Sequence, residues 1–362
     1  MVSSMPWSRS IAGVFVLALA IETSAQTPAL AVSLYHQKKY IMGTVFEIAV
    51  YDDSAPRANE AIEMALQEIV RLDWVMSNYK DKSELSALNR NAHSHAQSVS
   101  PDLYRVIEES LLYSRLTGGK FDVTVGPLVD RWKTVASGEP APSPAEQESL
   151  RACVGYEKVE LTPPDQIEFH SSCLRIDLGA IGKGYAVDRA AEILRSRGIK
   201  NALIDAGGST LYGMGAPPEQ SGWSVHLRDP SKKIDPQVIL HENSVSTSEQ
   251  TPASVLGNDF TGHIIDPSQG MPLRTAYAVS AVAKTGTASD GLSTSLLLVG
   301  PDRGKSLIES LRDSAAIWIS PEGQTTVVTS GPRILTNESA PSRLDTPYPG
   351  REGSVATKVK KN

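Results

Sequence analysis

The 362-residue chain has few of the features that assign a protein to a class at first sight. It carries a formal net charge of −6 and no long basic run in its body, which argues against nucleic acid as a main partner. Its apolar segment 11–20 is shorter than the roughly 20 residues that span a bilayer. The chain also lacks the G-x-G-x-x-G fingerprint and the P-loop spacing, so the two best-known nucleotide-binding loops are absent.

Cysteine is scarce as well, and its interpretation depends on export. Arg9 precedes the apolar segment and the small residues Ser24 and Ala25 follow it, a pattern that predicts a signal peptide over residues 1–25. An uncleaved membrane anchor is the less favoured alternative. Residues 26–38 are then expected to be a linker. In an oxidising compartment Cys153 and Cys173 could pair, although two buried thiols fit the sequence equally well.

Hydrophobic content of 40% is enough for one large domain or two fused lobes. Hydrophobic periodicity predicts helices over 55–76, 101–117, 287–300 and 301–311, with a short helix after Ser83 as N-cap. It predicts strands over 40–51, 276–282 and 315–319, a β meander within 159–176 and short strands over 210–248. A Pro-rich loop is expected over 137–144, and a disordered tail over 331–362.

Residues 175–208 form the most informative stretch. The pattern reads as strand, glycine turn, helix and strand, with a carboxylate and a glycine turn after each strand. Gly179, Gly182 and Gly184 allow close approach of the backbone to a ligand, and a helix N-terminus attracts phosphate. The same glycines also suit a helix packed tightly on a sheet. The stretch alone does not decide between the two.

Oxygen-bearing side chains recur beside the glycine turns. They are Asp122, Asp177, Asp205, Asp266, Asp290 and Thr294. Asp290 and Thr294 are four residues apart and so share one helix face, where a carboxylate and a hydroxyl could bind Mg²⁺. The alternative is an acidic residue that stabilises the helix dipole, and spacing alone favours it.

Six motifs, in order over roughly residues 40–320, resemble the ApbE family, the periplasmic FAD:protein FMN transferases. They are Met42-Gly-Thr44; Ser77-Asn-Tyr79 with Glu84-Leu85 and Asn89; Gly119 to Leu128; Asp177 to Asp188 followed by Asn201 to Gly208; His263-Ile-Ile-Asp-Pro267 with Gly270; and Ser289 to Thr294. The segment Asp177-Leu-Gly-Ala-Ile-Gly-Lys-Gly-Tyr-Ala-Val-Asp188 resembles the most distinctive signature of the family.

The resemblance implies an α+β fold over residues 39–330, with mixed or antiparallel sheets flanked by helices and a flavin cleft between two lobes. It implies an enzyme that uses FAD and Mg²⁺ and moves the FMN half of FAD onto a Thr or Ser hydroxyl of another exported protein, releasing AMP. The expected location is the periplasm. The expected acceptors are membrane-associated respiratory flavoproteins.

By motif position, the resemblance assigns the metal ligands as the Ala180 carbonyl, Asp290 and Thr294. It assigns flavin or adenine contacts to Met42, Tyr79, Lys120, Phe121, Asp122, Asp177, Lys183 and Ile264. His263 is predicted to be the base that accepts the hydroxyl proton, and the alternative is a histidine that orients the neighbouring strand. Two departures from the family pattern are Ser209 and Ser293, where relatives often carry an acidic or amide residue and a further Asp, respectively.

Two other functions fit the same residues. One is an FAD pyrophosphatase, which would use water as the acceptor and give FMN and AMP. The other is a non-catalytic exported flavin-binding protein, against which the presence of Asp290 and Thr294 argues. If the transferase reading is correct, Asp290→Ala should abolish Mg²⁺-dependent transfer and leave the chain folded, because a carboxylate in a surface cleft is not part of a core.

Overall fold

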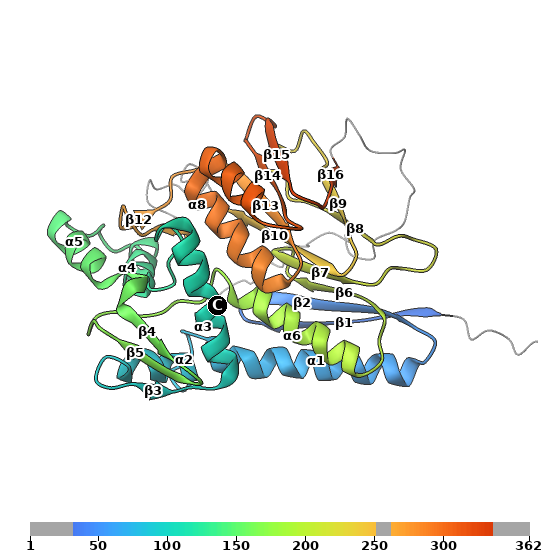
Figure 1. Cartoon of the computed structure of the whole chain (residues 1–362), viewed down its shortest axis with the longest axis horizontal. Helices are drawn as coiled ribbons and strands as arrows, with labels where there is room; N and C mark the ends of the chain where they lie inside the picture. The colour runs from blue at the N-terminus through green and yellow to red at the C-terminus, as the bar shows by residue number, and fades with distance from the viewer. Residues whose placement is uncertain (1–31, 251–261, 336–362) are drawn as a thin grey trace, which may run out of the picture. The chain divides into compact units, whose positions relative to one another are not determined.

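An eight-stranded antiparallel sheet forms the centre of the structure, a computed structural model that describes residues 32–250 and 262–335 (Figure 1). Its strand order is β1-β2-β6-β7-β10-β13-β14-β15. The strands are β1 (Ser33–Ile41), β2 (Thr44–Asp52), β6 (Asn201–Ala206), β7 (Thr210–Met214), β10 (Asn243–Glu249), β13 (Ala278–Ala283), β14 (Ala315–Ile319) and β15 (Thr325–Thr329). The described residues belong to one compact unit.

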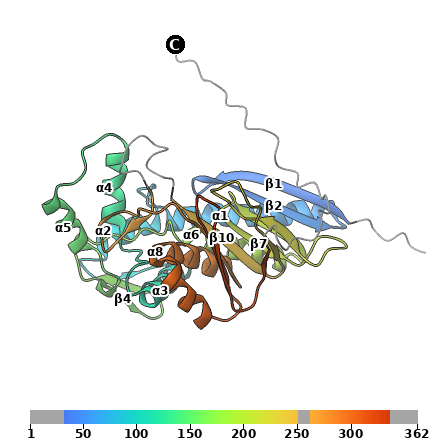
Figure 2. The ribbon, with the colours of Figure 1, turned by 90° about the horizontal axis from the view of Figure 1, so that it is seen from above.

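Three helices cover one face of this sheet: α1 (Ala55–Met76), α6 (Gly182–Ser196) and α8 (Gly286–Ser310). Figures 1 and 2 show α6 between the other two. The buried face of α1 repeats at helical spacing, and its N-cap Ser54 accepts a hydrogen bond from the Arg57 N–H. Helix α8 is kinked at Gly300, which has a φ of 75° and is followed by Pro301. The helix therefore consists of two segments, as the sequence predicts for residues 287–300 and 301–311.

The opposite face of the sheet is covered by a small three-stranded sheet, β16-β9-β8. Its strands are β8 (Trp223–His226), β9 (Gln237–Leu240) and β16 (Ile334–Leu335). Trp223, Val238 and Leu240 pack there against Leu203 and Ile317 of the large sheet. Because both faces are covered, β13 is buried along its whole length and β10 has no fully exposed residue, although one side of β10 is rich in serine.

The remaining elements form the end of the unit at the left of Figure 1. They are α2 (Glu84–Asn91), β3 (Gln97–Ser98), α3 (Pro101–Thr117), α4 (Gly126–Ala136), α5 (Pro144–Cys153), a 3₁₀ turn (Tyr156–Lys158), β4 (Val159–Thr162), β5 (Gln166–Phe169), β11 (Ile265–Asp266) and β12 (Met271–Pro272). Helix α3 contacts α8, and α4 contacts β12, so this end borders the same region as the α6 and α8 N-termini.

Most of the predicted elements are confirmed, including the α+β class, the antiparallel sheet flanked by helices and the helices over 55–76 and 101–117. The predicted strand 40–51 is instead a hairpin turn followed by β2, because Met42 and Gly43 both have positive φ. The linker prediction is wrong for residues 33–38, which belong to β1 and pair with β2 along its whole length.

Three other predictions also need correction. The Pro-rich loop ends at Ser143, whose side chain caps α5, a helix that the sequence analysis missed. Residues 174–176 are not a strand, since only Arg175 forms an isolated bridge, with Val125. Residues 334–335 of the expected tail form β16. The signal-peptide segment and residues 336–362 lie outside the described residues.

Cys153 and Cys173 form a disulfide, which excludes the alternative of two buried thiols. It links the C-terminus of α5 to the segment that leads into the glycine turn before α6. The bond closes a loop with a sequence separation of 20 residues.

Replacing both Cys153 and Cys173 by Ala should lower the free energy of unfolding by about 3 kcal/mol, because the unfolded chain regains the entropy of this loop. Urea unfolding of the oxidised wild type and of the variant measures the difference. The variant should respond no further to dithiothreitol. Equal stability of the oxidised wild type and the variant would contradict the expectation.

Helices α6 and α8 meet at a glycine-to-glycine contact. A Cβ at Gly184 would lie 2.1 Å from the Gly286 carbonyl oxygen and 2.7 Å from the Asp290 Cβ. The reciprocal Cβ at Gly286 would lie 2.6 Å from the Gly184 carbonyl oxygen. The tight-packing interpretation of the central glycines is therefore correct for Gly184, and it brings the start of α8 directly onto the first turn of α6.

Gly184→Ala should destabilise the protein by about 3 kcal/mol or more, since backbone atoms cannot move aside as a flexible side chain can. In an uncrowded helix the same change would stabilise by up to about 1 kcal/mol, so the sign of the effect is diagnostic. Glu192→Ala, at an exposed position of the same helix, is the matched control. Chemical denaturation measures both.

No helix within the described residues is both long enough and apolar enough to cross a membrane.

Candidate active site

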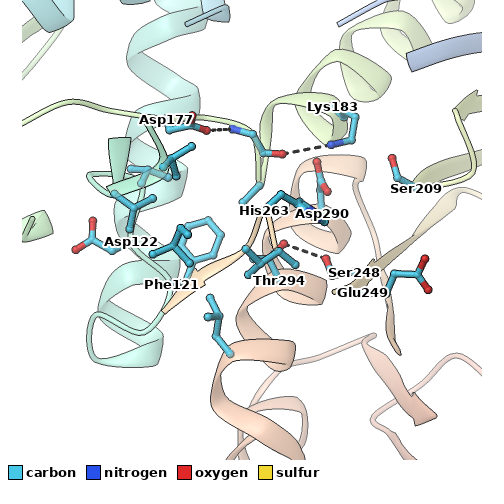
Figure 3. Close-up of a pocket in the computed structure, with 18 of the residues that line it drawn as sticks. Phe121, Asp122, Asp177, Lys183, Ser209, Ser248, Glu249, His263, Asp290 and Thr294 are labelled. Atoms are coloured by element: carbon cyan, nitrogen blue, oxygen red, sulfur yellow. Dashed lines mark hydrogen bonds between the residues drawn. The ribbon is translucent and has the colours of Figure 1, made fainter. Parts of the chain in front are cut away.

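A pocket of about 350 Å³ opens where the first turn of α6, the end of β10 and the first half of α8 meet residues 121–129 and 263–265 (Figure 3). Its two sides are the sheet with α6 and α8, and the end of the unit that carries α3 and α4. The predicted residues that line it are Tyr79, Phe121, Asp122, Asp177, Ala180, Lys183, His263, Ile264, Asp290 and Thr294.

The turn before α6 is held by its own polar groups. Asp177 Oδ1 accepts a hydrogen bond from the Gly179 N–H at 2.8 Å, and Lys183 Nζ donates to the Gly179 carbonyl at 3.2 Å (Figure 3). The turn thus presents the N-terminus of α6 and the ammonium group of Lys183 to the pocket, an arrangement that attracts a phosphate.

Asp290 and Thr294 lie one helical turn apart on α8, and both face β10. Asp290 is 4% exposed; its Oδ2 accepts the Gly184 N–H at 2.9 Å and its Oδ1 accepts the Ser246 hydroxyl at 3.2 Å. The Thr294 hydroxyl lies 3.0 Å from the Ser248 hydroxyl. These contacts fix the oxygens of both side chains at the pocket wall.

Ser293, one of the two departures from the family pattern in the sequence, is fully buried behind Asp290 and Thr294 and does not line the pocket. Its hydroxyl donates to the Asp290 carbonyl at 3.0 Å and lies 2.8 Å from the Ser248 hydroxyl. Ser293 therefore belongs to a row of hydrogen-bonded hydroxyl groups between α8 and β10, together with Ser246 and Ser248. These hydroxyl groups hold Asp290 and Thr294 in place.

The donor set at this wall fits a hard divalent cation. Within the described residues no N–H donates to the Ala180 carbonyl, because the Gly184 N–H that would do so in a regular helix donates to Asp290 instead. A carbonyl, a carboxylate and a hydroxyl thus line one pocket. No cluster of three or more His, Cys, Asp or Glu suited to a metal occurs in residues 32–250 and 262–335. An ion here would therefore also need oxygens from the bound substrate.

His263 is exposed toward the pocket, yet the surrounding protein partly desolvates its ring. This desolvation lowers the pKa of His263, and the positive charge of Lys183 lowers it further, while Glu249 opposes the shift. The imidazole is therefore neutral near pH 7 and able to accept a proton.

Three residues that the resemblance assigns to flavin or adenine contacts, Lys120, Met42 and Asp122, do not point their polar or apolar groups at the centre of the pocket. Lys120 does not line the pocket; its ammonium is 3.1 and 3.2 Å from the Asp266 carboxylate oxygens and 2.7 Å from the Ser268 hydroxyl. Met42 does not line the pocket either. It lies in the β1–β2 turn, and its Cε would be 3.9 Å from a Cβ added at Gly182.

Asp122 lines the pocket, but its carboxylate points away from Asp290 and His263 (Figure 3). It accepts hydrogen bonds from the Thr124 N–H, the Thr124 hydroxyl and the Tyr156 N–H at 2.7 to 2.9 Å. Burial raises the pKa of Asp122, and these bonds oppose that shift. Its carboxylate thus holds this loop to the residues that follow α5.

Several lining residues were not predicted as site residues. They are Val123, Val125, Val129, Lys133, Gly179, Ser209, Arg228, Thr247, Ser248, Glu249, Ile265 and Leu298. Arg228 and Glu249 form an ion pair at the rim. The Lys133 ammonium lies 4.5 Å from the centroid of the Tyr79 ring, which is 80% exposed. For some of them the sequence carried a signal: Gly179 is one of the central glycines, Ser209 is a departure from the family pattern, and Val123, Val125 and Ile265 lie within the family motifs.

A polar pocket at a helix N-terminus, with carbonyl, carboxylate and hydroxyl oxygens in its wall, is the type of site that binds a phosphate-bearing ligand. The sequence profile of the ApbE family matches residues 42–318. The chain belongs to the ApbE family.

Similar proteins support this assignment along most of the chain. The FAD:protein FMN transferase of Haemophilus influenzae is 28% identical over 328 residues, which are 85% of this chain and 92% of the relative. The structure of the flavin transferase ApbE from Vibrio cholerae matches with a TM-score of 0.72 and 27% identity, over 83% of this chain and 98% of that one. The apo Pseudomonas stutzeri flavinyl transferase ApbE gives a TM-score of 0.73 and 25% identity, over 83% and 96%.

Proposed function

We propose that this protein is an Mg²⁺-dependent FAD:protein FMN transferase, which moves the FMN moiety of FAD onto a Thr or Ser hydroxyl of an acceptor protein and releases AMP. The names of its relatives support the reaction class. The observation that carries the proposal is the convergence of Ala180, Asp290 and Thr294 with His263 and Lys183 on one pocket. Those groups match the needs of phosphoryl transfer, which depends on positioning and charge neutralisation.

The proposed step is a displacement at the phosphorus of the FMN half. The acceptor hydroxyl oxygen forms a bond to that phosphorus, the bond from phosphorus to the bridging oxygen breaks, and AMP leaves with the bonding electron pair. His263 takes the hydroxyl proton, because its neutral imidazole faces the pocket. Lys183 and the N-terminus of α6 offset the phosphate charge.

The Ala180 carbonyl, the Asp290 carboxylate and the Thr294 hydroxyl would hold Mg²⁺. The ion supplies charge neutralisation at the diphosphate. The chain itself fixes the side chains that carry two of these oxygens: Gly184 and Ser246 hold Asp290, and Ser248 holds Thr294.

The remainder of the pocket suits an aromatic ligand. Apolar walls come from Phe121, Val125, Val129 and Ile264, and Tyr79 offers a largely exposed ring for stacking. A volume of about 350 Å³ is at the low end for ligand pockets, so part of a dinucleotide would extend beyond it toward solvent. Such an open site also leaves access for the segment of an acceptor protein.

The reaction can be tested with purified protein, FAD, Mg²⁺ and an exported flavoprotein that carries an accessible Thr or Ser. In-gel flavin fluorescence on the acceptor, together with AMP release in equal amount, is the expected result. Free FMN and AMP without labelling would show an FAD pyrophosphatase instead. Bound, unreacted FAD would show a non-catalytic flavin-binding protein.

The site of action proposed for the enzyme is the periplasm, with membrane-associated respiratory flavoproteins as acceptors. The signal-peptide pattern of residues 1–25 supports export, and a disulfide between Cys153 and Cys173 is compatible with an oxidising compartment. Fractionation of cells expressing the full chain, with blotting of the periplasmic and cytosolic fractions, tests the location.

A further inference from the structure

Gln250 follows the end of β10 and is 5% exposed, yet its side chain is not paired within its own strand. Its Oε1 accepts the His263 N–H at 3.1 Å and the Ile264 N–H at 3.2 Å. Its Nε2 donates to the Ile264 carbonyl at 3.0 Å and to the Leu273 carbonyl at 3.2 Å. Both donors and both acceptor sites of the amide are therefore used, and all four bonds go to the backbone.

Next to His263 and Ile264 this segment has few other hydrogen bonds, because the bonds from Lys120 and Gln147 reach residues farther along the hairpin. Strands β11 and β12 pair only Ile265 with Pro272 and Asp266 with Met271, and one further bond joins the Leu273 N–H to the Ile264 carbonyl. Within the described residues, Gln250 is the acceptor for the backbone N–H groups of both His263 and Ile264. The amide thus replaces the strand that would otherwise pair with this edge of the hairpin.

Gly262, the residue directly before His263, leaves room for the side-chain amide of Gln250. A Cβ at Gly262 would lie 2.0 Å from Gln250 Nε2. A glycine directly before His263 lets the buried amide pack against the backbone there, so the position of His263 depends on Gln250 from two sides.

The end of β10 connects the hydrogen bonds of Gln250 to the proposed cation ligands Asp290 and Thr294. Ser248 lies near the end of β10, and Gln250 is the residue directly after the last residue of that strand, Glu249. Ser248 contacts Thr294, and Gln250 contacts the backbone of His263. The end of β10 therefore sets the distance between the oxygens of α8 and the imidazole (Figure 3 shows Ser248, Thr294 and His263 around one pocket).

We propose that Gln250 is a positioning residue for transfer: it holds the backbone of His263 so that the imidazole reaches the acceptor hydroxyl while the phosphates are held by α6 and α8. The inference rests on the proposed function and on His263 as its base. It assigns Gln250 no contact with FAD, so removal of the amide should change turnover and leave FAD binding unchanged.

The experiment compares Gln250→Ala and Gln250→Glu with Gln147→Ala in the full chain. Gln147 is the matched control, since its amide also donates to this hairpin, at the Gln269 carbonyl, 2.6 Å away and at the far turn. Gln250→Ala should lower kcat about 10²-fold with KM for FAD changed less than about 2-fold, because a displacement near 1 Å has that effect. Gln250→Glu keeps the acceptors for both N–H groups and should retain more activity. Gln147→Ala should behave as the wild type.

A double-mutant cycle separates positioning from general stability. In a His263→Ala background, Gln250→Ala should cause no further loss of kcat, because the group it positions is gone. An additive loss, an equal effect of Gln147→Ala, or a raised KM for FAD with unchanged kcat would each overturn the proposal. So would loss of folding in both Gln250 variants, seen by circular dichroism, since Gln250 would then be a core determinant.

Failure of the proposed function gives a different result. If the wild type binds FAD but labels no acceptor, the transferase assignment is wrong, and the same cycle is run on release of FMN and AMP. If His263→Ala retains full turnover, the base assignment is wrong, and Gln250 has no role through it. A turnover defect of Gln250→Ala that persists without His263 contradicts the clamp that Gln250 forms on the His263 backbone, whichever of these reactions the wild type catalyses.

Discussion

Asp290→Asn is expected to lower FMN transfer about 10³-fold and to remove its dependence on Mg²⁺, with FAD still bound through the aromatic side of the pocket. The charge of the carboxylate is what the cation would need, and loss of one preorganised charged group in a site of this kind typically has that effect. The amide keeps one oxygen, which can still accept the Gly184 N–H that now lies 2.9 Å from Oδ2.

The choice of Asn over Ala follows from the burial of this residue. The sequence suggested a carboxylate in a surface cleft, whose removal would leave the chain intact. Asp290 is instead buried, and Asp290→Ala would leave the Gly184 N–H without its partner at the α6–α8 contact. An unpaired buried N–H costs about 1–3 kcal/mol, so the Ala variant confounds stability with chemistry.

Asp302→Asn is the matched control, because it removes the same charge from an exposed position of α8. Acceptor labelling is measured against Mg²⁺ concentration for both variants, with thermal unfolding recorded in parallel. Full transfer by a folded Asp290→Asn protein, or an equal loss in Asp302→Asn, would show that the assignment of the cation to this wall is wrong.

The parts of the fold that the sequence predicts are those set by local forces. Helix α1 was located from apolar spacing alone, and Ser83 and Ser54 cap the helices that follow them. The order of the large sheet is a non-local property: β2 pairs with β6, and β10 lies between β7 and β13, through bonds between distant segments. No local pattern encodes those pairings, which is why β15 was missed and the hairpin of β1 was taken for a linker.

The same distinction applies to the site. Asp177, Lys183 and Asp290, which line the pocket, could be predicted from the sequence because they lie in glycine motifs, where close backbone approach leaves a recognisable pattern. Arg228, Glu249 and Gln250 carry no such mark, since only the fold brings them beside His263. Lys120 is the converse case: its motif is intact, yet it does not line the pocket, because Asp266, from a distant segment, binds its ammonium.

His263→Ala should lower kcat for transfer about 10²- to 10⁴-fold, the usual contribution of a positioned general base. Binding of FAD should change little, because the imidazole is assigned to the acceptor hydroxyl rather than to the flavin. Single-turnover labelling with saturating FAD and Mg²⁺ measures the loss. His170→Ala is the control, since that exposed imidazole pairs with Glu160, and neither residue lines the pocket.

The pH profile tests the same assignment independently. Transfer requires neutral His263, and desolvation with the charge of Lys183 lowers the pKa of this group below 6.5, so wild-type activity should persist at pH 6.5 and fall only at lower pH. Lys183→Met removes the cation that lowers the pKa of His263, so the acidic limb should move to higher pH. Glu249→Gln removes the charge that raises it, so the limb should move to lower pH. If the acidic limb moves in the same direction in Lys183→Met and Glu249→Gln, another group accepts the proton. The same conclusion follows if the acidic limb is unchanged in the residual activity of His263→Ala.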